Sequence, residues 1–129
     1  MTERRAGRAS DAPPPAGPYS HAVRSGSLVV TSGQIGVDPK TGALVGLDVA
    51  SQARQAWSNT VAALSSVSAE PADVVQVRVF LVELGDFEPM NAVFAELLPT
   101  PFPARTTVYV TMPPSVRIEI DALAVLREP

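Results

Sequence analysis

Two charged residues stand inside stretches that otherwise have the pattern of β-strands. Arg105 lies in FPARTTVYV (102–110), and Glu119 lies in VRIEIDALAV (116–125). In the second stretch apolar and charged residues alternate, which is typical of a strand with one buried and one exposed face. A guanidinium binds a carboxylate through two parallel hydrogen bonds, and a carboxylate can take a proton from water. Together the two residues could hold a small carboxylic acid and a water.

The two stretches are expected to pair as a hairpin around residues 111–115. In that arrangement Thr107 would face Glu119, and Arg105 would lie diagonally beside them, so that three polar groups line one patch of the sheet. The alternative is an ordinary ion pair on a solvated face, which is the commoner role of half-exposed charges.

The composition restricts the chemistry that the chain can perform. It has no cysteine and one histidine, His21, so disulfides, thiolate catalysis and metal sites built from several histidines are excluded. The GxSxG, P-loop and GxGxxG motifs are absent from the sequence. The chemistry must therefore use carboxylates, arginine, hydroxyls, amides and backbone groups, and His21 is interpreted as structural.

The bulk properties indicate a globular protein rather than a nucleic-acid-binding or membrane protein. The 129 residues fit one domain, with 46% hydrophobic and 18% charged residues. With 10 basic and 13 acidic residues, a net charge of −3 and 5% aromatics, the sequence offers neither a basic stripe nor a stacking platform for bases. No stretch approaches the roughly 20 apolar residues of a membrane span, and the N-terminus lacks the apolar core of a secretory signal. We expect a cytoplasmic protein without nucleic-acid or membrane partners.

The pattern along the chain predicts one α+β domain over residues 13–129, preceded by a flexible arm over residues 1–12. The expected elements are, in order, strands at 19–24 and 28–32, a helix from Asp48, a strand at 74–82, a helix from Asp86, and strands at 102–110 and 116–125. Strand pairs at both ends and two amphipathic helices favour a mixed sheet with both helices on one face.

Each predicted helix has one apolar stripe. Trp57 and Phe94 are expected in the core, whereas Gln52 and Asn59 are expected to face away from it. The face of the sheet without helices is expected to carry Arg78, Arg105, Thr107, Tyr109, Arg117, Glu119 and Asp121 among apolar residues. Such a mixed face is typical of an oligomer interface, so a site on it would lie between subunits.

Six motifs, taken in order, resemble one known family. They are GPYSHAV, TSGQIGVDPKTG, DVASQARQAWSN, MNAVF, FPART and RIEIDALAV, and they run from about Gly17 to Val125. They resemble the reactive intermediate deaminase family, also called RidA or YjgF. The resemblance implies a chorismate-mutase-like α+β fold and a homotrimer with clefts between subunits. It also implies hydrolysis of reactive 2-imino and 2-enamino acids to 2-oxo acids and ammonia, as metabolite damage control, without a cofactor or metal.

The resemblance also implies roles for individual residues. Arg105 matches the arginine that grips the substrate carboxylate, and Glu119 matches the glutamate that positions the attacking water. Tyr19 matches a tyrosine that lines the cleft, and Gly33 lies in a loop whose backbone approaches the ligand. Asn91 matches an asparagine of the second helix, although its place on the apolar stripe favours a bracing role.

Other functions remain open from the sequence. Many family members carry cysteine where this chain has Thr107, which leaves the substrate preference open. The chain could be a non-catalytic trimer that binds small carboxylates or a protein partner, or a pathway-specific enzyme that acts on a bulkier imine. Glu119 argues against a simple carboxylate binder, because a second negative charge beside the ligand would weaken binding.

Overall fold

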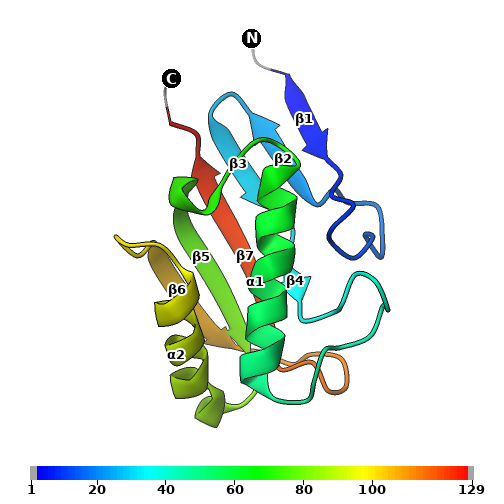
Figure 1. Cartoon of the computed structure of the whole chain (residues 1–129), viewed down its shortest axis with the longest axis vertical. Helices are drawn as coiled ribbons and strands as arrows, with labels where there is room; N and C mark the ends of the chain where they lie inside the picture. Colours follow the sequence, from blue (N-terminus) through cyan, green and yellow to red (C-terminus); the bar gives the residue numbers. More distant parts are fainter. Residues whose placement is uncertain (1–2, 128–129) are drawn as a thin grey trace.

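A mixed seven-stranded sheet carries two helices on one of its faces (Figure 1). The computed structural model describes residues 3–127. The strands are β1 (Arg4–Gly7), β2 (Ala22–Ser25), β3 (Leu28–Thr31), β4 (Gln34–Ile35), β5 (Val74–Leu81), β6 (Ala104–Tyr109) and β7 (Ile118–Val125). The helices are α1 (Val49–Ser65) and α2 (Phe87–Leu97), with short 3-10 turns at η1 (Pro71–Asp73) and η2 (Leu84–Asp86). The expected α+β class, with both helices on one face, is confirmed.

The strand order is β1-β2-β3-β7-β5-β6, with β4 paired to β7. The pair β5 and β6 is parallel, with α2 as its crossover, and the other pairs are antiparallel. The edge strand β6 therefore contacts β5 and not β7.

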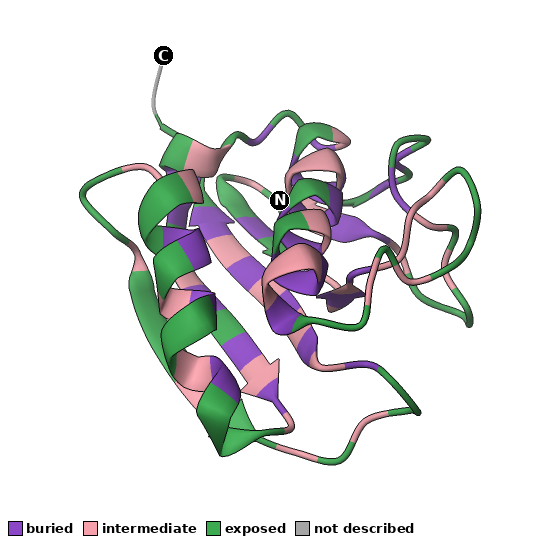
Figure 2. Cartoon of the chain, turned by 60° about the horizontal axis from the view of Figure 1, so that its bottom comes forward, coloured by how far each residue is buried: buried purple, intermediate pink, exposed green. Residues whose placement is uncertain are grey.

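The core fills the layer between the helices and the sheet (Figure 2). On β7 the residues Ile118, Ile120, Ala122 and Ala124 are buried there, and the residues that alternate with them face the other way, as the period of two predicts. Trp57 and Phe94 are also buried, as expected.

The two helix starts differ in how they are held. Asp48 caps α1, because its Oδ2 accepts a hydrogen bond from the Ser51 N–H at 2.9 Å. Asp86 occupies the same position before α2, but its side chain makes no capping bond. Its carboxylate instead binds the Arg117 guanidinium through two hydrogen bonds of 2.9 Å, which ties the start of α2 to the segment before β7.

The expected hairpin of residues 102–110 with 116–125 is wrong. β5 lies between β6 and β7 and pairs with both of them. The physical reason is that a crossover helix after β5 returns the chain parallel to β5, on the side where its edge is free. The chain then has to cross the end of β5 before it adds β7 on the other side.

The expected flexible arm is wrong for Arg4–Gly7, which form β1 and pair antiparallel with β2. The side chain of His21 holds the following segment in place. Its Nδ1 accepts a hydrogen bond from the Ala9 N–H at 2.9 Å, and its Nε2 lies 2.7 Å from the Pro13 carbonyl oxygen. The segment RRAG lacks β-branched and aromatic residues, so its strand is stabilised by pairing rather than by local preference. His21 is 2% exposed, in agreement with the structural role expected for it.

Candidate functional site

Arg105 lies on the edge strand β6, on the face that the helices cover. Its register partner on β5 is the core residue Val77, and laterally paired residues point to the same face. The guanidinium carbon lies 5.5 Å from the centroid of the Phe87 ring, and Nη1 lies 3.4 Å from Met90 Sδ. Phe87 and Met90 belong to the first turn of α2, so this helix gives the cation an apolar backing.

Arg105 differs in its ion pairing from two other arginines of the sheet region. Arg78 binds Asp121 with a shortest contact of 2.6 Å, and Arg117 binds Asp86 with a shortest contact of 2.9 Å. Within residues 3–127, Arg105 has no carboxylate at ion-pair distance. Its guanidinium is thus available to an external anion.

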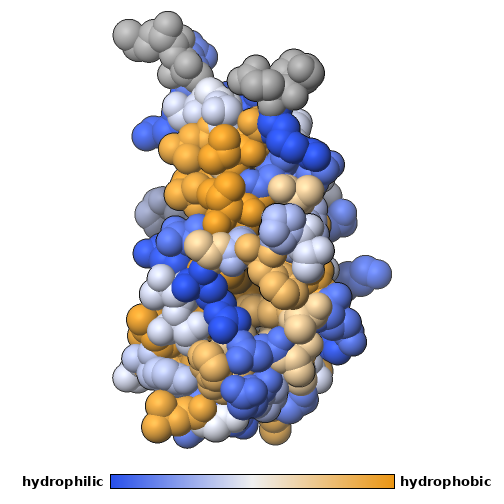
Figure 3. Space-filling model, turned by 90° about the vertical axis from the view of Figure 1, so that its left-hand side faces the viewer, coloured by the Kyte–Doolittle hydropathy of each residue, from blue (hydrophilic) through white to orange (hydrophobic). Residues whose placement is uncertain are grey.

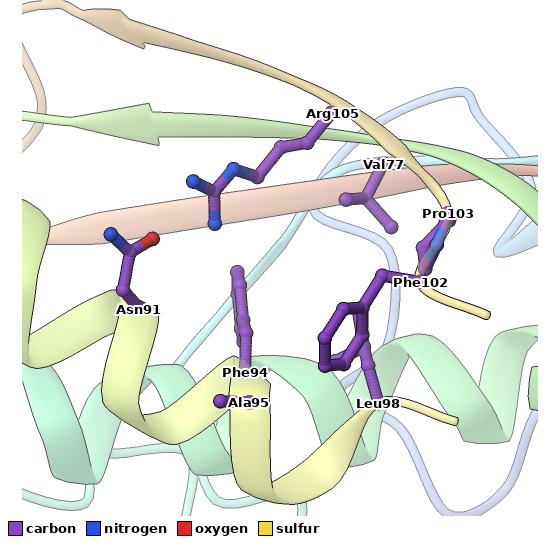
Figure 4. A pocket seen from close by; sticks show the side chains of 8 residues that line it. All are labelled: Val77, Asn91, Phe94, Ala95, Leu98, Phe102, Pro103 and Arg105. Carbon is purple, nitrogen blue, oxygen red and sulfur yellow. The ribbon is translucent and has the colours of Figure 1, made fainter. Parts of the chain in front are cut away.

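A groove of about 500 Å³ runs between α2 and β6, and Arg105 lines it (Figure 4). The guanidinium and the Asn91 amide point toward each other at one end of the groove. The remaining lining is apolar and consists of Val77, Phe94, Ala95, Leu98, Phe102 and Pro103. The groove therefore combines one polar end with a long apolar wall.

Glu119 lies on β7 and on the opposite face of the sheet. Its register partner on β5 is Phe80, and its chain neighbours Ile118 and Ile120 point into the core. Partial burial raises the pKa of the Glu119 carboxyl above its ordinary value; the nearby Asp121 carboxylate adds to the rise and the Arg78 guanidinium opposes it. A carboxylate with a raised pKa is a stronger base than an ordinary one.

Gly33 packs directly against the Glu119 carboxylate. A Cβ at this position would overlap a carboxylate oxygen, so the close approach requires glycine. The preceding residue, Ser32, donates a hydrogen bond of 2.6 Å from its hydroxyl to the Ser20 carbonyl oxygen. This bond joins the Gly33 loop to the loop that carries Tyr19.

Tyr19 is half exposed, and its hydroxyl oxygen accepts a hydrogen bond from the Ala16 N–H at 3.0 Å. The structure brings the loop of Tyr19 next to the Gly33 loop, and hence to the Glu119 side of the sheet. We call Tyr19, Gly33 and Glu119 the glutamate half-site.

The other three predicted site residues lie on the Arg105 side. Thr107 is two positions beyond Arg105 on β6 and pairs in register with the core residue Val79, so it points to the same face as Arg105. Asn91 lies at the polar end of the groove, and no hydrogen bond from its side chain to a loop is found among the described residues. We call Asn91, Arg105 and Thr107 the arginine half-site.

The two half-sites lie on opposite faces of one sheet, with β5 between their strands. The expected single patch of Arg105, Thr107 and Glu119 is therefore wrong for one chain. Tyr109, expected on the same open face, pairs with the core residue Leu81 and belongs to the helix-covered face as well.

Two side-chain amides that position the surrounding loops are buried, although the sequence predicted that they face away from the core. Gln52 donates to the Gly46 and Ser115 carbonyl oxygens at 2.9 and 2.8 Å, and its Oε1 accepts from the Arg117 N–H at 2.8 Å. Asn59 donates to the Ile35 and Val37 carbonyl oxygens at 3.1 and 2.9 Å, which anchors the chain after Gly33.

The spacing of residues along α1 indicates that these two amides are buried. Gln52 follows Val49 by three residues, and Asn59 follows Ala56 by three residues, so both lie on the buried stripe. Their polar type led to the wrong expectation that they face away. Both side chains are fully buried, and all buried side-chain polar atoms of the described residues have partners.

Within residues 3–127, no group of three or more histidine, cysteine, aspartate or glutamate side chains is arranged to hold a metal ion. Over the same residues, no helix has both the length and the apolar character needed to cross a membrane.

Known proteins resemble this chain in sequence and in fold. A 2-iminobutanoate/2-iminopropanoate deaminase of Salmonella typhimurium is 45% identical over 121 residues, which cover 91% of this chain and 94% of that protein. The structure of the YjgF gene product of E. coli has a TM-score of 0.86 at 41% identity and covers 95% of this chain and 99% of its own. E. coli TdcF, solved with bound serine, has a TM-score of 0.89 at 34% identity, with 95% and 99% covered.

A family model described as endoribonuclease L-PSP matches residues 9–126, almost the whole chain. The same region contains both half-sites and all six motifs. The chain therefore belongs to the endoribonuclease L-PSP family, the family that is also called RidA or YjgF.

Proposed function

We propose that this protein is an enzyme that hydrolyses reactive 2-imino and 2-enamino acids to 2-oxo acids and ammonia. The relatives named 2-iminobutanoate/2-iminopropanoate deaminase support this activity at 40–45% identity over most of the chain. The observation that carries the assignment of residues is the free guanidinium of Arg105, which has no carboxylate partner within the described chain.

Arg105 binds the carboxylate of the substrate in this proposal. Its planar fork matches the two oxygens of a carboxylate, and the ring of Phe87 behind it restricts the orientations that it can adopt. Fixing the carboxylate also fixes the adjacent imine carbon, because the two carbons are directly bonded. Positioning of this kind contributes several kcal/mol to catalysis.

Glu119 activates the water that attacks the imine carbon. The carboxylate accepts a proton from the water as its oxygen bonds to the carbon, and it passes this proton to the nitrogen, which gives a carbinolamine. The hydroxyl proton of the carbinolamine then moves to the nitrogen by the same route, the C–N bond breaks as the C=O bond forms, and ammonia leaves. The atoms balance without any other reactant: imine and water give the 2-oxo acid and ammonia. The raised pKa of Glu119 makes its carboxylate a more effective base than an ordinary glutamate.

The catalytic site lies between two copies of the chain, in a homotrimer. Arg105 and Glu119 face opposite sides of one sheet, so a substrate can contact both only if a second copy supplies one of them. The open face offers apolar surface for such contact, since Leu28, Val30 and Val125 are 41–46% exposed there. Figure 3 shows hydrophobic residues gathered on the side of the molecule that carries β6.

The activity is tested by generating 2-iminopropanoate and 2-iminobutanoate in situ and following 2-oxo acid formation against the spontaneous rate. The proposal expects a catalysed rate for both compounds. A rate equal to the spontaneous one, with a folded protein that still binds 2-oxo acids, would favour the non-catalytic carboxylate binder.

The shared site is tested by mixing two inactive variants. In trimers reassembled from Arg105→Ala and Glu119→Gln chains, some sites receive both native residues, and activity should return to about a quarter of the native value for random mixing. Each variant alone should stay inactive. Light scattering should give a mass near three times the 13.5 kDa of one chain. A monomer, or mixtures that regain nothing, would contradict the shared site.

We propose no role for RNA, although the description of the family model names an endoribonuclease. The net charge of −3 and the low aromatic content give RNA little to bind. A cytoplasmic location stays a prediction from the sequence.

A further inference from the structure

The groove beside Arg105 is larger than a short 2-imino acid requires. Its volume is about 500 Å³, within the range of pockets that bind molecules much larger than a three- or four-carbon acid. It begins at the polar end formed by Arg105 and Asn91 and continues along apolar residues toward Phe102 and Pro103 (Figure 4). This apolar extension has no role in carboxylate binding or water activation.

We infer that the groove binds the side chain of the substrate, and that the enzyme prefers 2-imino acids with branched aliphatic or aromatic side chains to those with a methyl or ethyl group. The inference rests on the proposed function, because Arg105 must hold the carboxylate for the side chain to enter the groove. It adds the substrate class and names the residues that select it.

The orientation of the bound substrate follows from the polar end and the apolar wall of the groove. The charged guanidinium lies at one end, so the carboxylate of the ligand has to lie there, and the lining becomes wholly apolar away from it. A side chain that pointed out of the groove would leave this wall in contact with water. An apolar side chain that lies along the wall instead removes its own surface and the surface of the wall from water, which is favourable in proportion to the buried area.

The inner wall of the groove is preformed by the core. Val77, Phe94 and Leu98 are 1%, 4% and 8% exposed, and they pack among the other core residues. A wall built from packed core residues does not have to be ordered when the ligand binds, so little of the binding free energy is lost.

The outer rim consists of Phe102, which is 57% exposed. Figure 4 shows its ring at the end of the groove opposite to Asn91, beside Leu98. A large aromatic side chain exposed at the mouth of an apolar groove can be covered by a bound ligand. Phe102 would then contact the far end of a branched or aromatic substrate and would not reach a methyl group.

The size of the preference follows from the methylene groups that enter the groove. One methylene in an enzyme pocket changes kcat/KM by about ten-fold or more, and an open groove lies at the lower end of that range. We therefore expect the imine derived from leucine to have a kcat/KM at least about ten-fold above that of the imine derived from alanine.

The experiment compares imines that an amino-acid oxidase generates from alanine, 2-aminobutanoate, leucine and phenylalanine. Ala95 lines the groove on α2, whereas Ala92 is exposed on the same helix outside the groove lining. Ala95→Phe should lower kcat/KM about ten-fold or more for the leucine and phenylalanine imines, and less than about two-fold for the alanine imine. Ala92→Phe, which adds the same side chain to the same helix, should leave all four values unchanged.

Three results would overturn the inference. The first is equal activity of the native protein on all four imines, and the second is an equal loss for all of them in an intact Ala95→Phe oligomer. The third is dissociation of the Ala95→Phe oligomer while Ala92→Phe stays assembled, since the groove would then be covered by a second copy of the chain.

A binding measurement separates this inference from the proposed function. Calorimetry with pyruvate and 4-methyl-2-oxopentanoate, the products from the alanine and leucine imines, does not depend on turnover. Tighter binding of the longer acid, lost in Ala95→Phe, would support the groove even if no imine were hydrolysed. Turnover without any discrimination by size, in rate or in binding, would leave the deaminase activity intact and refute the groove.

Discussion

Replacement of Arg105 gives the most direct test of the arginine half-site. Arg105→Ala removes two hydrogen bonds to the substrate carboxylate, each between charged groups and each contributing about 1.5–3 kcal/mol. The loss of both corresponds to a fall in kcat/KM of about 10²- to 10⁴-fold. Arg105→Lys retains the charge but not the fork, so it should recover only a small part of the lost activity.

The same variants should remain folded. Among the described residues Arg105 loses no ion pair on substitution, and its contact with the Phe87 ring contributes about 0.5–1 kcal/mol at an exposed site. We expect the melting temperature to fall by only a few degrees. A large loss of stability would mean that Arg105 is a structural residue.

Arg54→Ala is the matched control for net charge. Arg54 pairs with Glu96 on the helical surface, where a single ion pair adds little, so this variant should keep kcat/KM within about two-fold of native. The assay follows 2-oxo acid formation from 2-iminobutanoate, with melting temperature and oligomer mass measured on the same samples. Near-native activity of a folded Arg105→Lys oligomer would refute the carboxylate clamp.

Four further predictions concern the glutamate half-site and the N-terminal segment. Glu119→Gln should lower kcat by about 10²- to 10⁴-fold with 2-oxo acid binding retained; unchanged turnover in a folded oligomer would exclude the proton-accepting role. Gly33→Ala should lower kcat more than ten-fold, because the added Cβ displaces the Glu119 carboxylate. The control is Gly85→Ala, where a Cβ meets no other atom, and its kcat should stay within about two-fold of native. Equal effects of the two substitutions on kcat would disprove the close approach of Gly33 to Glu119. The active form of Glu119 is deprotonated, so activity should fall as the pH drops through the pKa of this carboxyl. Arg78→Gln should move this loss of activity to higher pH, because it removes a positive charge that lowers the pKa of Glu119. NMR titration of the labelled carboxyl carbon measures this pKa directly, and a pKa lowered by Arg78→Gln would contradict the reasoning. His21→Ala should lower the free energy of unfolding by about 2 kcal/mol in denaturant titration without changing kcat of the folded fraction; a selective loss of kcat would indicate a catalytic role.

The secondary structure from β2 to β7 was largely predictable, because it follows from local patterns. The alternation along β7 and the capped stripe of α1 are properties of short sequence windows, and the structure confirms both. The short strands β1 and β4 escaped prediction. They have few residues with strand preference, and their partners lie far along the chain.

The site residues were recognisable by type and by family motif, whereas their arrangement was not. Alternation assigns Arg105 and Glu119 each to one side of its own strand, but it does not say which sides coincide. That depends on the strand order, and the parallel placement of β6 beside β5 is decided by the packing of α2.

The sequence by itself determined the family, the fold class and the chemical groups available. These groups include a guanidinium and a carboxylate, whereas the sequence has no thiol and a single imidazole. The tertiary structure alone decided that Arg105 has no carboxylate partner among the described residues, that Gly33 touches Glu119, and that the two half-sites face opposite sides of one sheet. The physical reason is one of range: residue type and periodicity act within a few residues. Strand order and burial instead result from contacts between segments that lie tens of residues apart.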